Sequence, residues 1–316
     1  METTLDVRGV TRRYGTREVL KGITFAAQKG EIIALLGRNG TGKSTLMNTI
    51  TGYLCQSGGD ISICGYDVLI QPLEARRRAG YLPEQPPLYP DMTVTEYLRY
   101  CCRLRGLKAS TQTAEIARVI ELTGLEAYAH RLSGRLSKGQ RLGVAQALLG
   151  QPPLLILDEP GSGLDPLQMA QMREVIRRAG QESTVLLSSH LLSEVTNVCG
   201  RAIVLDEGVI RYDGTMDALL RGAASLRLMY RGDAPMMALI RELPGVTEVT
   251  EQDCREDGCH LLLIRHEMDA DLRAQVSALC YENHCALLEE TNGSDALEDA
   301  FLHVIARKDI SRKEVE

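Results

Sequence analysis

A glycine-rich octapeptide is the segment of this sequence that most directly predicts chemistry. Gly37 to Ser44 reads Gly-Arg-Asn-Gly-Thr-Gly-Lys-Ser and fits the pattern G-x4-G-K-S/T between an apolar strand pattern at Glu31–Leu36 and a helical pattern at Thr45–Thr51. Glycines let backbone N–H groups approach phosphate oxygens closely, and a helix N-terminus favours their negative charge. The segment therefore predicts a phosphate cradle in which Lys43 pairs with the terminal phosphates of ATP and Ser44 offers its hydroxyl to Mg²⁺.

Two carboxylates follow the apolar run Leu154–Leu157 directly. Open α/β sheets bind ligands at the carboxyl ends of their strands, so we expect Asp158 to hold the Mg²⁺. Glu159 is suited to orient or deprotonate the attacking water. Acidic residues after a strand are often only solvated ends or caps, but the cradle at Gly37–Ser44 favours the functional interpretation.

Four further motifs appear in an order that resembles the ATP-binding subunits of ABC transporters. Leu136-Ser-Lys-Gly-Gln140 resembles the LSGGQ signature, and Ser162-Gly-Leu-Asp165 resembles the D-loop that follows the second carboxylate. His190 resembles the switch histidine, and Tyr14 stands in the place of the aromatic residue that stacks on adenine. The motif style is similar to that of bacterial export-type subunits that pair with a separately encoded permease.

The resemblance implies that two subunits share each nucleotide, since the signature of one covers the γ-phosphate that the other holds. ATP would then join a homodimer or heterodimer, and hydrolysis would release it and move a separate transmembrane permease. The implied catalytic residues are Lys43, Glu159 and His190. The implied nucleotide-binding residues are Tyr14, Gly37, Arg38, Asn39, Gly40, Thr41, Gly42, Lys43, Ser44 and Thr45. The signature residues that would act on the partner's nucleotide are Ser137, Lys138, Gly139 and Gln140, and the D-loop residue is Asp165.

The sequence departs from the family pattern in two places. Relatives commonly carry Gln directly after Gly-Tyr-x-Pro, whereas here Gly80–Pro83 is followed by Glu84 and then Gln85. Either of these two side chains could complete the metal site with Ser44 and Asp158. The stretch that begins at Gly139 is also about two residues shorter than in many relatives, which would rotate the following helix by roughly 200°.

Other classes of protein share parts of this pattern. A soluble ABC ATPase of translation or repair is the alternative function, but such members usually carry two cassettes or long coiled coils. A P-loop GTPase would need Asn-Lys-x-Asp, which does not occur in the sequence, and a small-molecule kinase would need an acceptor site. A degenerate nucleotide-binding scaffold without enzymatic activity would have lost a functional residue. Here all four are present: Lys43, Asp158, Glu159 and His190.

Residues 1–221 have the pattern of an α/β domain, with a helical insert at about 93–150. Alternating strand and helix patterns favour a parallel sheet with helices on both faces. The resemblance to ABC transporter subunits implies that the insert and the surface after Tyr81 receive the permease. The expected strands are Leu5–Val10, Val19–Ala27, Ile32–Leu36, Ile61–Cys64, Leu154–Leu157, Val185–Ser188, Ile203–Leu205 and Val209–Tyr212.

The strand and helix pattern of residues 222–316 predicts a second, small α+β domain. Its elements follow the order β-α-β-β-α-β, and a helix at Asp295–Ala306 comes after them. Its role is interpreted as dimer support or regulation. The domain also holds a cluster of possible metal ligands that could bind zinc or, as we expect, simply pack in strands and helices. These residues are Cys254, Cys259, His260, Cys280, His284 and Cys285.

Bulk properties limit the partners. A net charge of −6 and a pI near 5.7 argue against nucleic acid as a partner. No apolar run approaches the roughly 18 to 20 residues that cross a bilayer, and the acidic start lacks the apolar core of a secretory signal. We therefore expect the protein at the cytoplasmic face of the plasma membrane, held there by the permease, with its nine cysteines reduced.

Overall fold

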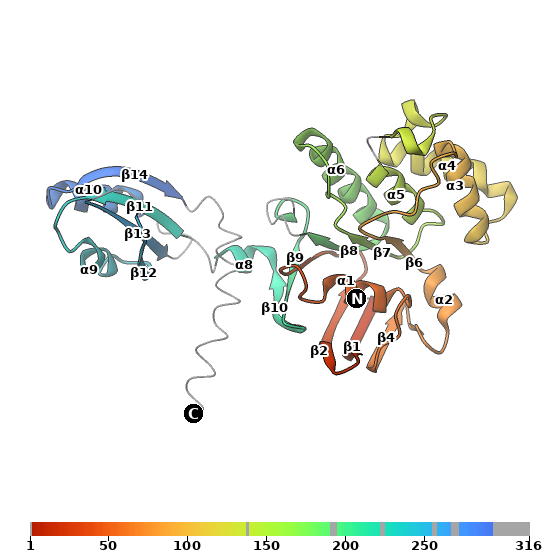
Figure 1. Ribbon diagram of the computed structural model, residues 1–316, viewed down its shortest axis with the longest axis horizontal. Helices are drawn as coiled ribbons and strands as arrows, with labels where there is room; N and C mark the ends of the chain where they lie inside the picture. The colour runs from red at the N-terminus through yellow and green to blue at the C-terminus, as the bar shows by residue number, and fades with distance from the viewer. Residues whose placement is uncertain are drawn as a thin grey trace. The chain divides into compact units, whose positions relative to one another are not determined.

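The computed structural model describes residues 2–136, 139–189, 195–221, 225–254, 258–266 and 272–292. The chain divides into two compact units, Met1–Asp213 and Gly214–Glu316. The sequence-based boundary, between residues 221 and 222, lies slightly further along the chain. Each unit is described by itself below (Figure 1).

A six-stranded sheet forms the centre of the first unit, in the order β10-β9-β3-β8-β7-β6. The strands are β3 (Ile32–Leu36), β6 (Ala79–Leu82), β7 (Leu154–Asp158), β8 (Thr184–Ser189), β9 (Arg201–Asp206) and β10 (Val209–Thr215). The pairs that join β9, β3, β8, β7 and β6 are parallel. Every residue of β7 and β8 is buried, as continuous apolar strands in a covered parallel sheet should be. The carboxyl ends of these strands therefore meet at one edge.

A second sheet in the first unit is antiparallel, with strand order β2-β1-β4-β5. It contains β1 (Thr3–Tyr14), β2 (Arg17–Gln28), β4 (Gly58–Ile63) and β5 (Tyr66–Asp67). The prediction that Leu5–Val10, Val19–Ala27 and Ile61–Cys64 belong to a parallel sheet is wrong. Only Gly15 and Thr16 separate β1 from β2, and a two-residue connection joins antiparallel neighbours, whereas parallel strands need a long crossover.

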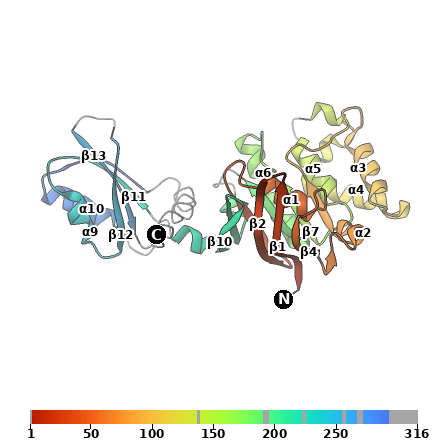
Figure 2. The ribbon, with the colours of Figure 1, turned by 60° about the horizontal axis from the view of Figure 1, so that its bottom comes forward.

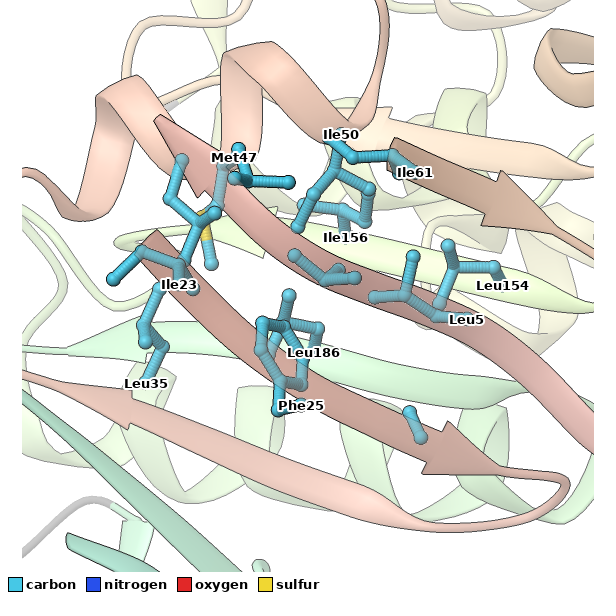
Figure 3. Packing of buried hydrophobic residues seen from close by; sticks show 14 of the residues in the cluster. Leu5, Ile23, Phe25, Leu35, Met47, Ile50, Ile61, Leu154, Ile156 and Leu186 are labelled. Carbon is cyan, nitrogen blue, oxygen red and sulfur yellow. The ribbon is translucent and has the colours of Figure 1, made fainter. Parts of the chain in front are cut away.

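The main core lies where apolar side chains of the two sheets meet those of α1 (Lys43–Ile50). Figure 3 shows Leu5 and Phe25 from the antiparallel sheet in one cluster with Ile156 and Leu186 from the parallel sheet and Ile50 from α1. Burial of side chains of this size stabilises the fold by about 1.5 to 3 kcal/mol each. Because α1 is anchored in this core, the position of its N-terminus relative to the parallel sheet is fixed.

Helices α3, α4 and α5 occupy the stretch where the sequence predicts the helical insert. In Figures 1 and 2 they lie on the opposite side of the first unit from β10. Thr93 is the N-cap of α3 and forms a capping box with Glu96. The Thr93 hydroxyl accepts the backbone N–H of Glu96, and the Glu96 carboxylate accepts the backbone N–H of Thr93. The helices of this unit are α2 (Pro72–Arg77), α3 (Val94–Leu104), α4 (Ala109–Thr123), α5 (Gly139–Ala147) and α6 (Pro166–Glu182), with 3-10 turns at Glu126–Tyr128 and Ser133–Arg135.

The second unit is a four-stranded antiparallel sheet with helices packed on one face. Its strand order is β12-β13-β11-β14, and the chain order from β11 to β14 is the predicted β-α-β-β-α-β. Its elements are α8 (Met216–Arg221), β11 (Ser225–Arg231), α9 (Met236–Arg241), β12 (Val246–Gln252), β13 (Cys259–His266), α10 (Arg273–Glu282) and β14 (Ala286–Asn292). The helix predicted at Asp295–Ala306 lies outside the described residues.

No helix in the described part of the chain has the length and apolar character that crossing a membrane requires.

Candidate functional site

The glycine-rich loop connects β3 to the first turn of α1, as the sequence predicts. Gly42 precedes the helix with φ of 112°, a left-handed conformation that side chains rarely adopt. Gly37 is required for a different reason, because a Cβ there would lie 2.5 Å from the backbone oxygen of Leu205 and 2.6 Å from the hydroxyl of Thr41. Both glycines thus let the loop pass close to its neighbours and deliver the helix N-terminus to solvent.

Lys43 is a buried cation at the start of α1. Its ammonium group donates to the carbonyl oxygens of Gly37 at 2.6 Å and Arg38 at 3.3 Å. Burial lowers the pKa of Lys43, while the nearby carboxylates of Glu159, Asp158 and Glu84 oppose that shift. Burial of a charged lysine is costly, so the negative charge of a bound polyphosphate would stabilise it.

A cavity of about 370 Å³, here called the Lys43 cavity, opens at the N-terminus of α1. The described residues that line it are Val19, Asn39, Gly40, Gly42, Lys43, Ser44, Thr45, Glu84, Glu159 and Ser162. Glu84 is among them and Gln85 is not. The structure therefore directs Glu84, of the two candidates, toward the cradle.

Asp158 and Glu159 are held by the neighbouring strand. Asp158 ends β7, is 2% exposed and pairs in register with Ser188 of β8. The Ser188 hydroxyl donates to Asp158 Oδ1 at 2.6 Å and accepts the backbone N–H of Glu159 at 2.9 Å. Glu159 itself has φ of 50°, a conformation that costs of order 1 to 3 kcal/mol for a residue with a side chain. Ser188 thus fixes the carboxylate of Asp158 and the backbone of Glu159.

The donor set fits a magnesium ion. Mg²⁺ prefers oxygen ligands and usually takes one or two from the protein, the rest from phosphates and water. Ser44 offers a hydroxyl to the Lys43 cavity and Glu84 and Glu159 offer carboxylates, with Asp158 close enough to influence the Lys43 ammonium. The helix N-terminus and Lys43 supply the positive field that a nucleotide phosphate requires.

Tyr14 lies at the end of β1 with 44% of its surface exposed. The Arg12 guanidinium stands 4.7 Å from the centre of its ring. Tyr14 does not line the Lys43 cavity, although Val19 on the adjoining strand β2 does. An accessible ring near that strand leaves a face on which an adenine base could stack.

The remaining predicted site residues are only partly described. Asp165 caps α6, where its side chain accepts the backbone N–H of Gln168 at 2.8 Å. Gly139 begins α5 and Gln140 follows it in the helix. Ser137, Lys138 and His190, and the side chain of Gln140, lie outside the described residues.

Three residues of this site have no role assigned from the sequence. Ser188 is the last residue of the expected strand Val185–Ser188, and Ser162 is the first residue of the motif Ser162–Asp165. Ser188 could have been noticed as a hydroxyl near the end of an otherwise apolar strand. Val19 gave no signal, because an apolar residue in a strand is expected in any sheet.

Several members of the cysteine and histidine cluster pack against neighbouring residues of the second unit. Cys280 and Cys285 are buried in its core, and the His260 ring stacks on Tyr230, with 5.1 Å between ring centroids. Cys254 contacts the sulfur of Met229. Within the described residues no three His, Cys, Asp or Glu side chains stand close enough to hold a metal ion.

Comparisons with known proteins found a matching family, similar sequences and similar structures. The profile of the family described as "ABC transporter" matches residues 20–162. An ABC transporter ATP-binding protein of Bacillus subtilis (strain 168) is 30% identical over 305 residues, which cover 95% of this chain and 99% of that protein. A bacitracin transport ATP-binding protein of Bacillus licheniformis is 30% identical and covers 96% of this chain and 98% of its own length. A solved structure of an ATP binding subunit of an ABC transporter has a TM-score of 0.63 and 33% identity, covering 69% of this chain and 92% of that chain.

Proposed function

Because this chain belongs to the ABC transporter family and is an ATP-binding and ATP-hydrolysing subunit that powers a separate permease, we propose that hydrolysis takes place in the Lys43 cavity. The observation that carries this proposal is the convergence of Lys43, Glu84 and Glu159 on one cavity at the N-terminus of α1. Phosphoryl transfer to water requires a positive group and carboxylates, and this cavity has one positive group and two carboxylates.

Each residue has a distinct role in the proposal. Lys43 exchanges its bonds to loop carbonyls for bonds to the β- and γ-phosphates. Glu159 accepts a proton from the attacking water or orients that water, and its half-buried position beside Asp158 keeps it in reach of the cavity. Because the phosphates bring negative charge to an ammonium already deprived of solvent, their binding favours the charged form of Lys43.

Ser44 and Asp158 are the proposed protein ligands of Mg²⁺, with Glu84 beside them. When bound, Mg²⁺ would offset the negative charge of the phosphates. Ser188 holds Asp158 in place through its 2.6 Å hydrogen bond. The carboxylate is therefore positioned before the ion arrives, so little reorganisation is needed on binding.

Two ATPase subunits, identical or related, would complete each site. The signature of one subunit, Ser137–Gln140, would cover the γ-phosphate held by the other, and His190 would contact the same phosphate. Asp165, which caps α6, would lie between the two. This part of the proposal is supported by the motifs and by their resemblance to the family.

The proposed division of labour follows the two domains expected from the sequence. Residues 1–221 hydrolyse ATP, the helical insert at about 93–150 docks the permease, and residues 222–316 support or regulate the dimer. The permease would hold the protein at the cytoplasmic face of the plasma membrane. The likeness to a bacitracin transport ATP-binding protein favours transport, and the resemblance of the motifs to export-type subunits favours export as its direction.

Replacement of the cradle lysine tests the proposal. Lys43→Ala should weaken MgATP binding at least tenfold, since hydrogen bonds to charged groups contribute about 1.5 to 3 kcal/mol. Lys29→Ala is the matched control, because Lys29 is an exposed lysine that pairs only with Glu2 among the described residues. Fluorescence titration and steady-state hydrolysis measure both variants. If Lys43→Ala bound MgATP as tightly as the wild-type protein does, the Lys43 cavity would be excluded as the nucleotide-binding site.

A further inference from the structure

Three sulfur-bearing residues stand near one end of the sheet in the second unit. Met229 lies in β11, Cys259 begins β13, and Cys254 follows the last residue of β12 by two positions. The Cys254 Sγ lies 3.9 Å from the Met229 Sδ. These three residues are called here the sulfur cluster, and none of them lines the Lys43 cavity.

The strand register brings the two cysteines of the sulfur cluster together. In the antiparallel pairing of β12 with β13, Gln252 stands opposite Leu261. The same register, continued by two residues, reaches Cys254 on one side and Cys259 on the other. Directly opposed residues of an antiparallel pair have Cβ atoms about 4.5 to 5.5 Å apart. The two thiols therefore belong to one cross-strand pair at the end of the ladder.

Met229 shares a face of the sheet with Cys259. Arg231 stands opposite Cys259 in the pairing of β11 with β13, and Met229 precedes Arg231 by two residues, so all three side chains lie on one side. The other side of the sheet is buried against α9 and α10. Diagonal neighbours such as Met229 and Cys259 are about 7 to 8 Å apart, within reach of a long side chain.

The contact between Cys254 and Met229 places the third sulfur over the same face. Strand β13 lies between β12 and β11 (Figure 1). The Cys254 thiol must therefore extend across β13 to come within 3.9 Å of the Met229 sulfur, and Cys259 lies on β13 at this level. The three sulfur atoms thus converge on one point from three adjacent strands.

The surroundings of the sulfur cluster suit an ion that enters from solvent. Cys254 and Cys259 are both half-buried, so their thiols are accessible. Leu261, the next residue on this face of β13, is only 9% exposed and gives the cluster an apolar floor. The Arg231 guanidinium donates to the Cys259 Sγ at 3.3 Å. A monovalent ion held by two thiolates has a net negative charge, which this guanidinium would offset.

The donor set selects the class of ion. Thiolate and thioether sulfurs are soft ligands that favour Cu(I). Structural zinc takes four ligands from Cys, His, Asp and Glu, and within the described ranges of the chain no three such side chains stand close enough to hold a metal ion. The thioether of Met229, which is not a usual zinc ligand, supplies the third donor here.

We propose that the sulfur cluster binds one Cu(I) ion through the sulfur atoms of Met229, Cys254 and Cys259. Two S–H bonds break as two Cu–S bonds form, both protons pass to the solvent, and no electron is transferred. The bound ion links the end of β12 to β13 and β11, so it cross-links the tip of this sheet. This proposal goes beyond the proposed function, because it assigns a ligand to the second unit and does not depend on ATP hydrolysis.

The test uses the full chain, reduced and free of oxygen, which competes for Cu(I) with the coloured chelator bicinchoninate. Loss of an outer partner of a metal ligand costs about 10- to 100-fold in affinity. Loss of a ligand should cost at least as much, so Met229→Leu, Cys254→Ser and Cys259→Ser should each weaken binding at least about tenfold. Ag(I) should displace the copper and Zn²⁺ should not.

Two matched controls should bind Cu(I) as the wild type does. Cys55→Ser removes an exposed cysteine of the first unit. Met237→Leu removes a methionine that packs against the core on the helix side of the sheet. X-ray absorption at the copper edge should find three sulfur neighbours in the wild-type protein and two in Met229→Leu.

Several results would overturn the proposal. Wild-type Cu(I) affinity in Met229→Leu and in both cysteine variants would exclude the sulfur cluster, and loss of binding in Cys55→Ser would mark an adventitious surface thiol only. Displacement of the copper by Zn²⁺ would show that the site is not selective for soft ions. Met229→Leu nearly conserves side-chain volume, so it keeps the test valid even if a cysteine variant fails to fold. ATP turnover is a separate readout, and its absence would refute the proposed function without affecting the copper result.

Discussion

Ser188→Ala is a small change with a large expected effect on hydrolysis. The hydroxyl lost in this variant donates to a carboxylate that is 2% exposed and accepts the N–H of the residue proposed as general base. A hydrogen bond to a charged group contributes about 1.5 to 3 kcal/mol. If about 2 kcal/mol of that is lost in the transition state, turnover falls roughly thirtyfold. Nucleotide binding should change little, because Lys43 and the loop remain intact.

Ser183→Ala is the matched control for this prediction. Ser183 precedes the opposite end of β8, is also buried, and donates to the carbonyl of Pro152 at 2.7 Å. Its loss should reduce the free energy of unfolding by about 1 kcal/mol and leave turnover unchanged. Steady-state phosphate release and urea denaturation of both variants give the comparison. Wild-type turnover in Ser188→Ala, or an equal loss in Ser183→Ala, would refute the reasoning.

Two further predictions concern the Lys43 cavity. The pKa of Lys43 is lowered by burial from its ordinary value of 10.5, and bound phosphates favour the charged form, so ATP affinity should fall as pH rises through the lowered pKa. Affinity titrations at alkaline pH check this prediction. Lys43→Arg stays charged, so its ATP affinity should not depend on pH. An ATP affinity of the wild-type protein that is independent of pH up to 10.5 would contradict the prediction. Glu84→Ala should slow magnesium-dependent turnover at least tenfold, whereas Gln85→Ala should slow it less than about twofold. A larger effect of Gln85→Ala in the same assay would show that Gln85 is the functional side chain.

The parts of the site that sequence predicted are those set by local spacing. The loop at Gly37–Ser44 is specified by its own glycines and by the elements on either side. Asp158 follows a run of four apolar residues, so its place at a strand end could be predicted from that run alone. The side chain of Glu84 could not be separated from that of Gln85, because both follow a four-residue strand and their directions depend on how the chain leaves β6.

The parts that sequence did not predict depend on which strands are neighbours. Ser188 acts on Asp158 only because β8 lies beside β7, and no local pattern specifies strand order. The antiparallel pairing of β1 with β2 was missed although its cause, the two-residue connection at Gly15 and Thr16, is present in the sequence. The apolar periodicity of these strands suits either kind of sheet, so the short turn was the informative feature.

Glu159→Gln tests whether Glu159 acts on the attacking water, because it removes a proton acceptor and changes the shape of the side chain very little. The measurement is single-turnover hydrolysis of MgATP together with its affinity and the oligomeric state of the protein. We expect unchanged affinity for MgATP, turnover slower by roughly 10²-fold or more, and dimers that persist with ATP bound. Hydrolysis by Glu159→Gln at the wild-type rate would contradict it.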